Sequence, residues 1–154
     1  MQPTDTFANA YEAAISDLEA WIATHRTVAV IECERTPSYW HVRVTPIAAN
    51  ACPAELILHR SQRCDLSAGS ETYENQPIGD PARWRLVLDA IVAGDVIVRR
   101  WVTSATAAVA KIETVISLAD GTEWRGERTL AALPDAATER RDQHVLPYQR
   151  RSAA

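Results

Sequence analysis

The chain has 154 residues, a net charge of −4 and a hydrophobic fraction of 47%. This length suits one globular domain, residues 1–154, that buries most of the surface of its unfolded chain. The mild acidity excludes the strongly basic surface that is needed to wrap nucleic acid. No apolar run approaches the roughly 20 residues of a membrane span, and no apolar signal core opens the sequence. We therefore expect a cytoplasmic protein that binds neither nucleic acid nor a membrane.

Residues 5–25 are predicted to form an amphipathic helix that begins after an N-cap at Thr4 or Asp5. Their apolar residues recur at steps of three and four, which indicates one stripe on a helix with a period of 3.6 residues. This stripe consists of Phe7, Tyr11, Ala14, Ile15, Leu18, Trp21 and Ile22. A single stripe needs one apolar surface to pack against, so we expect the helix to cover a β-sheet.

A β-hairpin is predicted next, with strands at residues 28–34 and 39–45 around the loop 35–38. With Glu34 opposite Tyr39, strand alternation gathers the apolar residues on one face, and a shift by one residue would mix them with polar ones. The apolar face then holds Ala29, Ile31, Cys33, Trp40, Val42 and Val44. This face is predicted to be buried.

A third strand is predicted at residues 55–60. Residues 62–79 are polar, rich in turn residues and without periodicity, so they are predicted to form a long connection. A second helix is predicted to begin with Asp80 as its N-cap and Pro81 at its first position, and to end at Gly94. Its apolar stripe consists of Trp84, Val87, Leu88, Ile91 and Val92.

Three further antiparallel strands are predicted at residues 96–103, 110–118 and 122–130. Asp120-Gly121 between two alternating runs is typical of a tight hairpin turn. Because side chains alternate between the two faces of a strand, the turn also predicts the register of the strands that it joins.

That register places Ile116 opposite Trp124, and the preceding loop is predicted to place Trp101 opposite Ile112. One face is then apolar and is predicted to be buried, with Ile97, Trp101, Ile112, Ile116, Leu118 and Trp124. The other face is charged and is predicted to meet solvent, with Arg100, Lys111, Glu113, Arg125 and Glu127.

A short polar helix is predicted at residues 135–142, within a C-terminal segment 134–154. The predicted order is helix, three strands, helix, three strands, in two αβββ-like halves, 5–61 and 80–130, joined by the loop 62–79. Two helices with single apolar stripes suit one face of an antiparallel sheet. We therefore predict an α+β fold, a two-layer sandwich with an antiparallel sheet and helices on one of its faces.

The polar face of the first hairpin carries a group of charged and titratable residues, Glu32, Glu34, His41 and Arg43. Glu32 is predicted to lie beside His41, and a carboxylate next to an imidazole is the minimum for general acid–base chemistry. The alternative is a solvated strand face with cross-strand charge pairs. No nucleophile or glycine-rich loop lies at a useful spacing from the group, so we assign no catalytic residue and keep these four as candidates.

Two other patterns are too weak to assign a site. The tripeptides that begin at His25 and His59 are similar to the paired H-x-S/T motifs of two-histidine phosphoesterases, but His25 lies at a helix end and not in a strand. Cys33, Cys64, His41 and His59 show no ligand spacing of a zinc site. We therefore predict no metal and no cofactor, and the odd number of cysteines favours a reducing compartment.

The lack of an assembled catalytic set favours a non-enzymatic protein-binding module of the chaperone or adaptor type. The predicted element order resembles that of small acidic secretion chaperones, which are dimers that hold an unfolded segment of a client. Toxin-neutralising immunity proteins are also compatible with this order. The resemblance implies a protein partner and a homo-oligomer, for which a sheet edge is the predicted contact.

The second hypothesis begins from the tryptophans, which all fall on faces predicted to be buried: Trp21, Trp40, Trp84, Trp101 and Trp124. Such a set can form a plain core or line a ligand cavity between sheet and helices. With the four charged candidates of the first hairpin as its polar groups, that cavity would belong to a small-molecule-binding protein or a small enzyme.

Overall fold

The computed structural model describes residues 3–131 and 138–149. These residues form two helices and nine strands. In chain order they are α1 (Pro3–His25), β1 (Ala29–Arg35), β2 (Tyr39–Pro46), β3 (Ala54–His59), β4 (Arg63–Ala68), β5 (Glu71–Pro77), α2 (Arg83–Ala93), β6 (Val96–Thr103), β7 (Val109–Ser117), β8 (Glu123–Thr129) and β9 (Thr138–His144). The fold is α+β and its sheets are antiparallel, as predicted.

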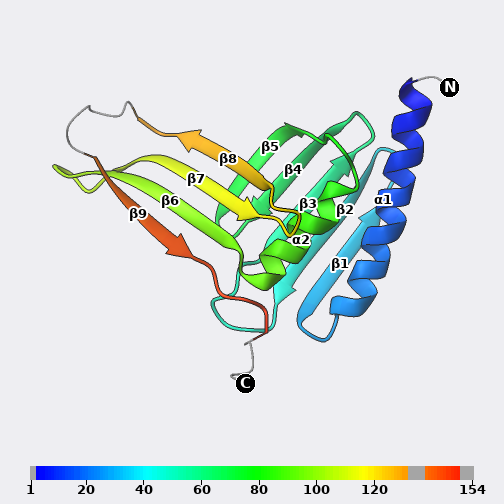
Figure 1. Ribbon diagram of the computed structural model, residues 1–154, viewed down its shortest axis with the longest axis horizontal. Helices are drawn as coiled ribbons and strands as arrows, with labels where there is room; N and C mark the ends of the chain where they lie inside the picture. Colours follow the sequence, from blue (N-terminus) through cyan, green and yellow to red (C-terminus); the bar gives the residue numbers. More distant parts are fainter. Residues whose placement is uncertain (1–2, 132–137, 150–154) are drawn as a thin grey trace.

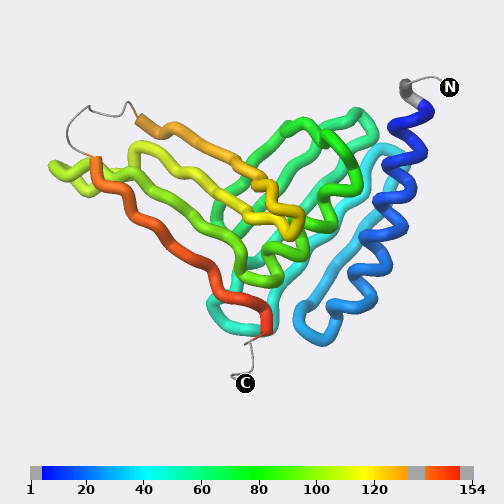
Figure 2. Tube along the Cα trace, viewed as in Figure 1, coloured from blue at the N-terminus to red at the C-terminus, as the bar shows by residue number. Residues whose placement is uncertain are grey.

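The strands make two sheets. The first has five strands in the order β1-β2-β3-β4-β5, and the second has four in the order β8-β7-β6-β9. Both helices and part of the four-stranded sheet lie over the same face of the five-stranded sheet (Figure 1). The tube in Figure 2 shows that the first sheet grows by adding neighbours in chain order.

One core lies between the five-stranded sheet and the elements that cover it. On α1 the predicted stripe is buried except for Phe7, which is partly buried, and the Tyr11 hydroxyl donates to the Leu58 carbonyl of β3 at 2.7 Å. The indole Nε1 of Trp21 donates to Asp89 Oδ1 of α2 at 2.7 Å, which joins the two helices. Each of these hydrogen bonds gives the polar atom of a buried side chain a partner. The helices can therefore pack on the sheet without leaving these polar atoms unsatisfied.

The predicted fold class is wrong in its architecture. The chain does not form a two-layer sandwich of helix–three strands–helix–three strands, because its strands divide into separate sheets of five and four. The four-stranded sheet covers part of the face that was predicted to be covered by helices alone. Tyr73 of β5 meets Trp124 of β8 edge to face, with ring centroids 5.4 Å apart.

The predicted connection at residues 62–79 contains strands β4 and β5. In β4 the inward residues are Cys64, Leu66 and Ala68, and the outward ones are polar. This alternation has period two, but only one of its inward residues, Leu66, is large and apolar, so it is less evident than the alternation in β1–β3. Asn75, with a φ of 54°, lies beside a register shift between β4 and β5, which further interrupts the pattern.

The predicted polar helix at residues 135–142 is also wrong where the structure describes it. Residues 138–144 form β9, which pairs with β6, and residues 135–137 lie outside the described residues. The sequence of β9 is TERRDQH, so no apolar residue marks its strand period. Cross-strand charge supplies part of its pairing, because Asp142 lies opposite Arg99 with 3.9 Å between Oδ2 and Nε.

The register of the first hairpin differs from the prediction by two residues. Glu34 lies opposite His41, and the turn is tighter than expected because the Thr36 amide donates to the Tyr39 carbonyl. A shift by two keeps every side chain on its predicted face, so Trp40 and the aliphatic residues of this face are buried as predicted. Cys33 is the exception to this burial, because it is exposed on the edge strand β1.

The predicted register between β6 and β7 is wrong by one residue. Arg100 lies opposite Ile112, and Trp101 lies opposite Lys111. A shift by one exchanges the two faces of β6, so Trp101 stands on the charged outer side with Lys111 Nζ 4.8 Å from its ring centroid. Arg100 points inward instead. The predicted pair of Ile116 and Trp124 in the next hairpin is confirmed.

The predicted start of α2 is wrong, because Ala82 and not Asp80 is its N-cap, whereas its predicted end is confirmed. Helix α2 begins two residues after Pro81, and the Asp80 side chain accepts from the Ala82 amide in the turn before it. Gly94 ends the helix as predicted, with a φ of 81° in the left-handed region. Within residues 3–131 and 138–149, neither helix has the length and apolarity to cross a bilayer.

Candidate functional site

One face of the five-stranded sheet is covered by no described helix or strand (Figure 1). We call it the outer face. Its side chains alternate with the buried ones along β1 to β5, and they are Val30, Glu32, Glu34, Tyr39, His41, Arg43, Thr45, Glu55, Ile57, His59, Arg63, Asp65, Ser67, Thr72 and Glu74. All four candidate residues of the first hairpin lie on this face.

The outer face is acidic. Its carboxylates are Glu32, Glu34, Glu55, Asp65 and Glu74, and its guanidinium groups belong to Arg43 and Arg63 alone. The excess of carboxylates gives this side of the sheet a negative potential that favours a cationic surface or ligand.

His41 of β2 takes its carboxylate from β3 and not from β1. Its Nε2 lies 2.6 Å from Oε1 of Glu55, and Arg43 Nη2 lies 3.5 Å from the same oxygen. Glu32, which was predicted to lie beside His41, instead faces Arg43 at 3.6 Å. Glu34 is the cross-strand neighbour of His41, but its carboxylate accepts from the Tyr39 hydroxyl at 3.4 Å.

A second histidine–carboxylate pair lies next to the first. His59 Nε2 is 3.0 Å from Asp65 Oδ2, and the Tyr39 ring meets the His59 ring edge to face at a centroid distance of 6.2 Å. Burial alone would raise the pKa of Asp65. The hydrogen bonds from the Asn75 amide, at 2.7 Å, and from His59 outweigh this effect and hold that pKa below its ordinary value of 3.8.

The strand registers explain this arrangement. Ile57 lies directly between His41 of β2 and Asp65 of β4, while His59 lies opposite Tyr39. A carboxylate beside each imidazole selects its tautomer and orients its ring. Each imidazole therefore has a defined hydrogen-bonding direction on a partly solvated sheet face. The arrangement suits recognition of polar groups.

Sequence reasoning placed His41, Arg43 and the two glutamates of β1 in one polar group. It did not place Glu55, His59 or Asp65 in that group. For Glu55 and His59 a signal existed, because both lie two residues from Ile57 and alternate with the buried leucines of their strand. Asp65 lay in the segment that was predicted to be a connection. The partners of the histidines are thus set by pairing between β2, β3 and β4, which a single hairpin could not indicate.

The other candidate constellations do not assemble. His25 ends α1 on the covered side of the sheet, where its ring stacks on Trp21 at 4.1 Å, while His59 is on the outer face. Cys64 is buried on the covered side, and burial raises the pKa of its thiol to about 12. Among the residues that the structure describes, no group of three His, Cys, Asp or Glu side chains is placed to hold a metal ion.

The tryptophans and the four charged candidates lie on opposite sides of the sheet. Trp21, Trp40 and Trp84 are fully buried in the core, and the outer face contains no tryptophan. Trp84 and Trp124 do line a cavity of about 270 Å³ between the end of β5 and β8, whose polar wall includes Arg83 and Arg125. The structure therefore does not place tryptophans beside Glu32 and His41 in one cavity.

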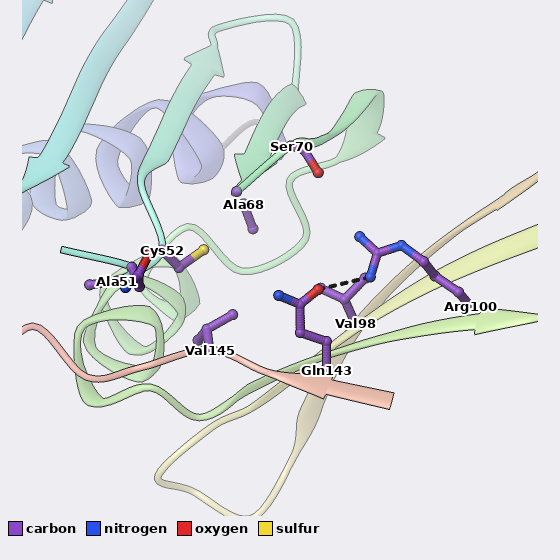
Figure 3. Close-up of a pocket in the computed structure, with 10 residues that line it drawn as sticks. Ala51, Cys52, Ala68, Ser70, Val98, Arg100, Gln143 and Val145 are labelled. Atoms are coloured by element: carbon purple, nitrogen blue, oxygen red, sulfur yellow. Dashed lines mark hydrogen bonds between the residues drawn. The ribbon is translucent and has the colours of Figure 1, made fainter. Parts of the chain in front are cut away.

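A further cavity, of about 160 Å³, lies where the two sheets diverge (Figure 3). The loop before β3, the end of β4 and the turn after it, β6, and β9 with the residue that follows it contribute its walls. The residues that line it are Asn50, Ala51, Cys52, Ala68, Gly69, Ser70, Val98, Arg100, Gln143 and Val145. Arg100 Nη1 donates to Gln143 Oε1 at 3.0 Å across its rim.

We expect Asp65→Asn to lower the free energy of unfolding by about 1 kcal/mol at neutral pH. A carboxyl group whose pKa is lowered by folding stabilises the fold above its unfolded pKa, and this contribution is lost as the pH falls through the folded pKa. The difference between wild type and variant should therefore shrink below about pH 4. Urea unfolding across this pH range measures it.

The matched control for Asp65→Asn is Glu74→Gln, because Glu74 is exposed on the same face and its carboxylate has no partner in the described structure. Glu74→Gln should change stability little at any pH. A cost of Asp65→Asn that is the same at pH 7 and at low pH would contradict the role of its ionised form.

Comparison with known proteins adds no assignment. No protein-family model, no curated protein and no solved structure matches this chain.

Proposed function

We propose that this protein is a non-enzymatic protein-binding module whose contact surface is the outer face. The observation that carries the proposal is a five-stranded sheet with one face left uncovered by the described chain, carrying partly exposed aromatic and aliphatic groups amid charges. Protein interfaces typically combine such a centre with a polar rim. The two histidine–carboxylate pairs supply directional contacts at that centre.

The centre of the outer face consists of Tyr39, Ile57 and the two histidines, which are all partly exposed. Val30, on the edge strand β1, is 62% exposed on the same face and extends the apolar part of the surface. The surrounding carboxylates favour a partner whose contact surface is basic, because complementary potentials speed association and select partners.

The outer face is better suited to contact a partner than the open edge of β1. Backbone pairing to an edge strand needs free carbonyl and amide groups. The Arg26 side chain donates to the Ile31 carbonyl of β1 at 3.1 Å and so occupies one of these groups. Self-association through this edge would require that bond to break, whereas the outer face is open without any rearrangement.

Affinity capture from lysate of the source organism tests the proposal with two arginine variants. Ile57→Arg places a cation in the centre of the outer face, and Ala13→Arg adds the same charge on the exposed side of α1. Proteins retained by the wild type and by Ala13→Arg should be lost with Ile57→Arg, and their retention should weaken as salt is raised. Circular dichroism verifies that both variants fold.

The same retained proteins with Ile57→Arg as with the wild type would exclude the outer face as the contact surface. No specific retention by the wild type, over repeated lysate conditions, would contradict protein binding itself.

A further inference from the structure

The cavity between the diverging sheets presents hydrogen-bond donors without a matching negative charge. Figure 3 shows the Arg100 guanidinium at its rim and the Gln143 side chain beneath it. Because Gln143 Oε1 accepts from Arg100 Nη1 at 3.0 Å, its amide nitrogen points the other way, toward the interior of the cavity. Arg100 and Gln143 thus offer N–H groups to the same small space.

Arg100 is an uncompensated cation. It forms no ion pair with any described residue, although most arginines of the chain do. Its cross-strand neighbour on β9 is Arg141, which is a like charge directly opposite. Such a pair is destabilising by itself. No Asp or Glu lines the cavity, so nothing within it balances the positive charge.

Apolar side chains make up most of the other walls, which also include the polar residues Asn50 and Ser70. Val98, Val145, Ala51 and Ala68 line them, and the thiol of Cys52 points inward among them. Burial raises the pKa of Cys52 to about 11, so the thiol stays neutral and contributes no competing negative charge. A ligand that fits therefore has one anionic end near Arg100 and a short aliphatic part against these side chains.

We propose that this cavity binds a small carboxylate with a short aliphatic chain, which Arg100 and Gln143 hold by its two oxygens. A guanidinium fork and a second N–H match the planar geometry of a carboxylate. The volume of about 160 Å³ is below that of drug-sized sites, roughly 300–1,000 Å³. The ligand is either a free small acid or the carboxyl end of a peptide, and the chemistry at Arg100 is the same for both.

Isothermal titration with four probes tests the proposal. Butyrate and butyramide differ in the anionic end alone, and the peptide Gly-Ser-Gly-Ala-Val is compared with its C-terminal amide. Saturable binding of butyrate at millimolar concentrations, without binding of butyramide, supports a site for free acids. Binding of the peptide acid and not of its amide, with butyrate inactive, supports a site for a peptide terminus. No saturable binding of either acid overturns the proposal.

Two arginine variants locate the binding. Arg100→Gln should weaken the acid that binds by at least about tenfold, because a charge-assisted hydrogen bond is lost. Arg140→Gln removes an arginine from the outer side of the same sheet and should leave binding unchanged. Since Arg100 forms no ion pair with a described residue, Arg100→Gln should fold as well as the wild type, and Gln143→Leu provides a second variant with a weaker loss. Equal affinity of wild type and Arg100→Gln overturns the site.

Discussion

We expect Gly126→Val to lower the free energy of unfolding by about 3 kcal/mol. A Cβ atom at Gly126 would lie 2.7 Å from the ring of Trp124 and 2.7 Å from the ring of Tyr73. Tyr73 belongs to the five-stranded sheet and is held there by a 2.7 Å hydrogen bond between its hydroxyl and that of Thr114. Neither ring can move away without opening the contact between the two sheets. Urea unfolding followed by tryptophan fluorescence measures the change.

Glu127→Val is the matched control, because it adds the same side chain one residue further along β8, on the solvent side. It loses an exposed ion pair with Lys111 and should cost no more than about 1 kcal/mol. Gly126→Val with the stability of wild type would contradict the close approach of β8 to β5.

Trp21→Ala should lower the free energy of unfolding by about 3–5 kcal/mol. Trp21 is 2% exposed, fills the space between α1 and α2, and donates to Asp89. Its loss leaves a cavity and removes the hydrogen bond that joins the helices. Since proteins of this size are stable by about 5–15 kcal/mol, the variant should unfold at much lower urea concentration.

Trp101→Ala tests whether the loss of stability depends on the burial of Trp21 and not on the removal of any tryptophan. Trp101 stands on the outer side of the four-stranded sheet, partly exposed, in contact with Lys111. Its truncation should cost no more than about 1.5 kcal/mol. A larger cost for Trp101→Ala than for Trp21→Ala would restore the inward position that side-chain alternation predicted for Trp101.

The two register errors show how far alternation can predict a sheet. In the first hairpin the error was two residues, so the predicted core face survived although every cross-strand partner changed. Between β6 and β7 it was one residue, and the faces of β6 were exchanged. The run Val96-Ile97-Val98 is apolar on both faces, so its pattern could not distinguish the two registers.

The strands that sequence reasoning missed share a physical cause. In β4 the inward residues are Cys64, Leu66 and Ala68, of which only Leu66 is large and apolar, and in β9 every residue is polar. Neighbouring strands stabilise both, through backbone pairing and cross-strand charges that depend on residues far apart in the chain. A local hydrophobic pattern reveals a strand through its large apolar residues, and β4 and β9 together contain only one, Leu66.

The candidate site was predictable in part. Its polar face followed from the sequence, and the partners of its histidines did not. Strand alternation predicted that His41 and Arg43 lie on a polar face, which the structure places as the outer face. The carboxylate beside His41 comes from Glu55, and the second pair, His59 and Asp65, needs the registers of β3 and β4. Long-range pairing set these partners, and sequence spacing alone does not contain it.

A single ion pair crosses between the two sheets at Glu71 and Arg128, within the part of the chain described. Glu71 is 4% exposed, and its Oε2 accepts from Arg128 Nη2 at 3.1 Å. If one sheet slid along the other, this carboxylate would remain enclosed without a counter-charge, at a cost of several kcal/mol. The pair therefore favours one alignment of the two sheets. Apolar contact alone would permit several alignments.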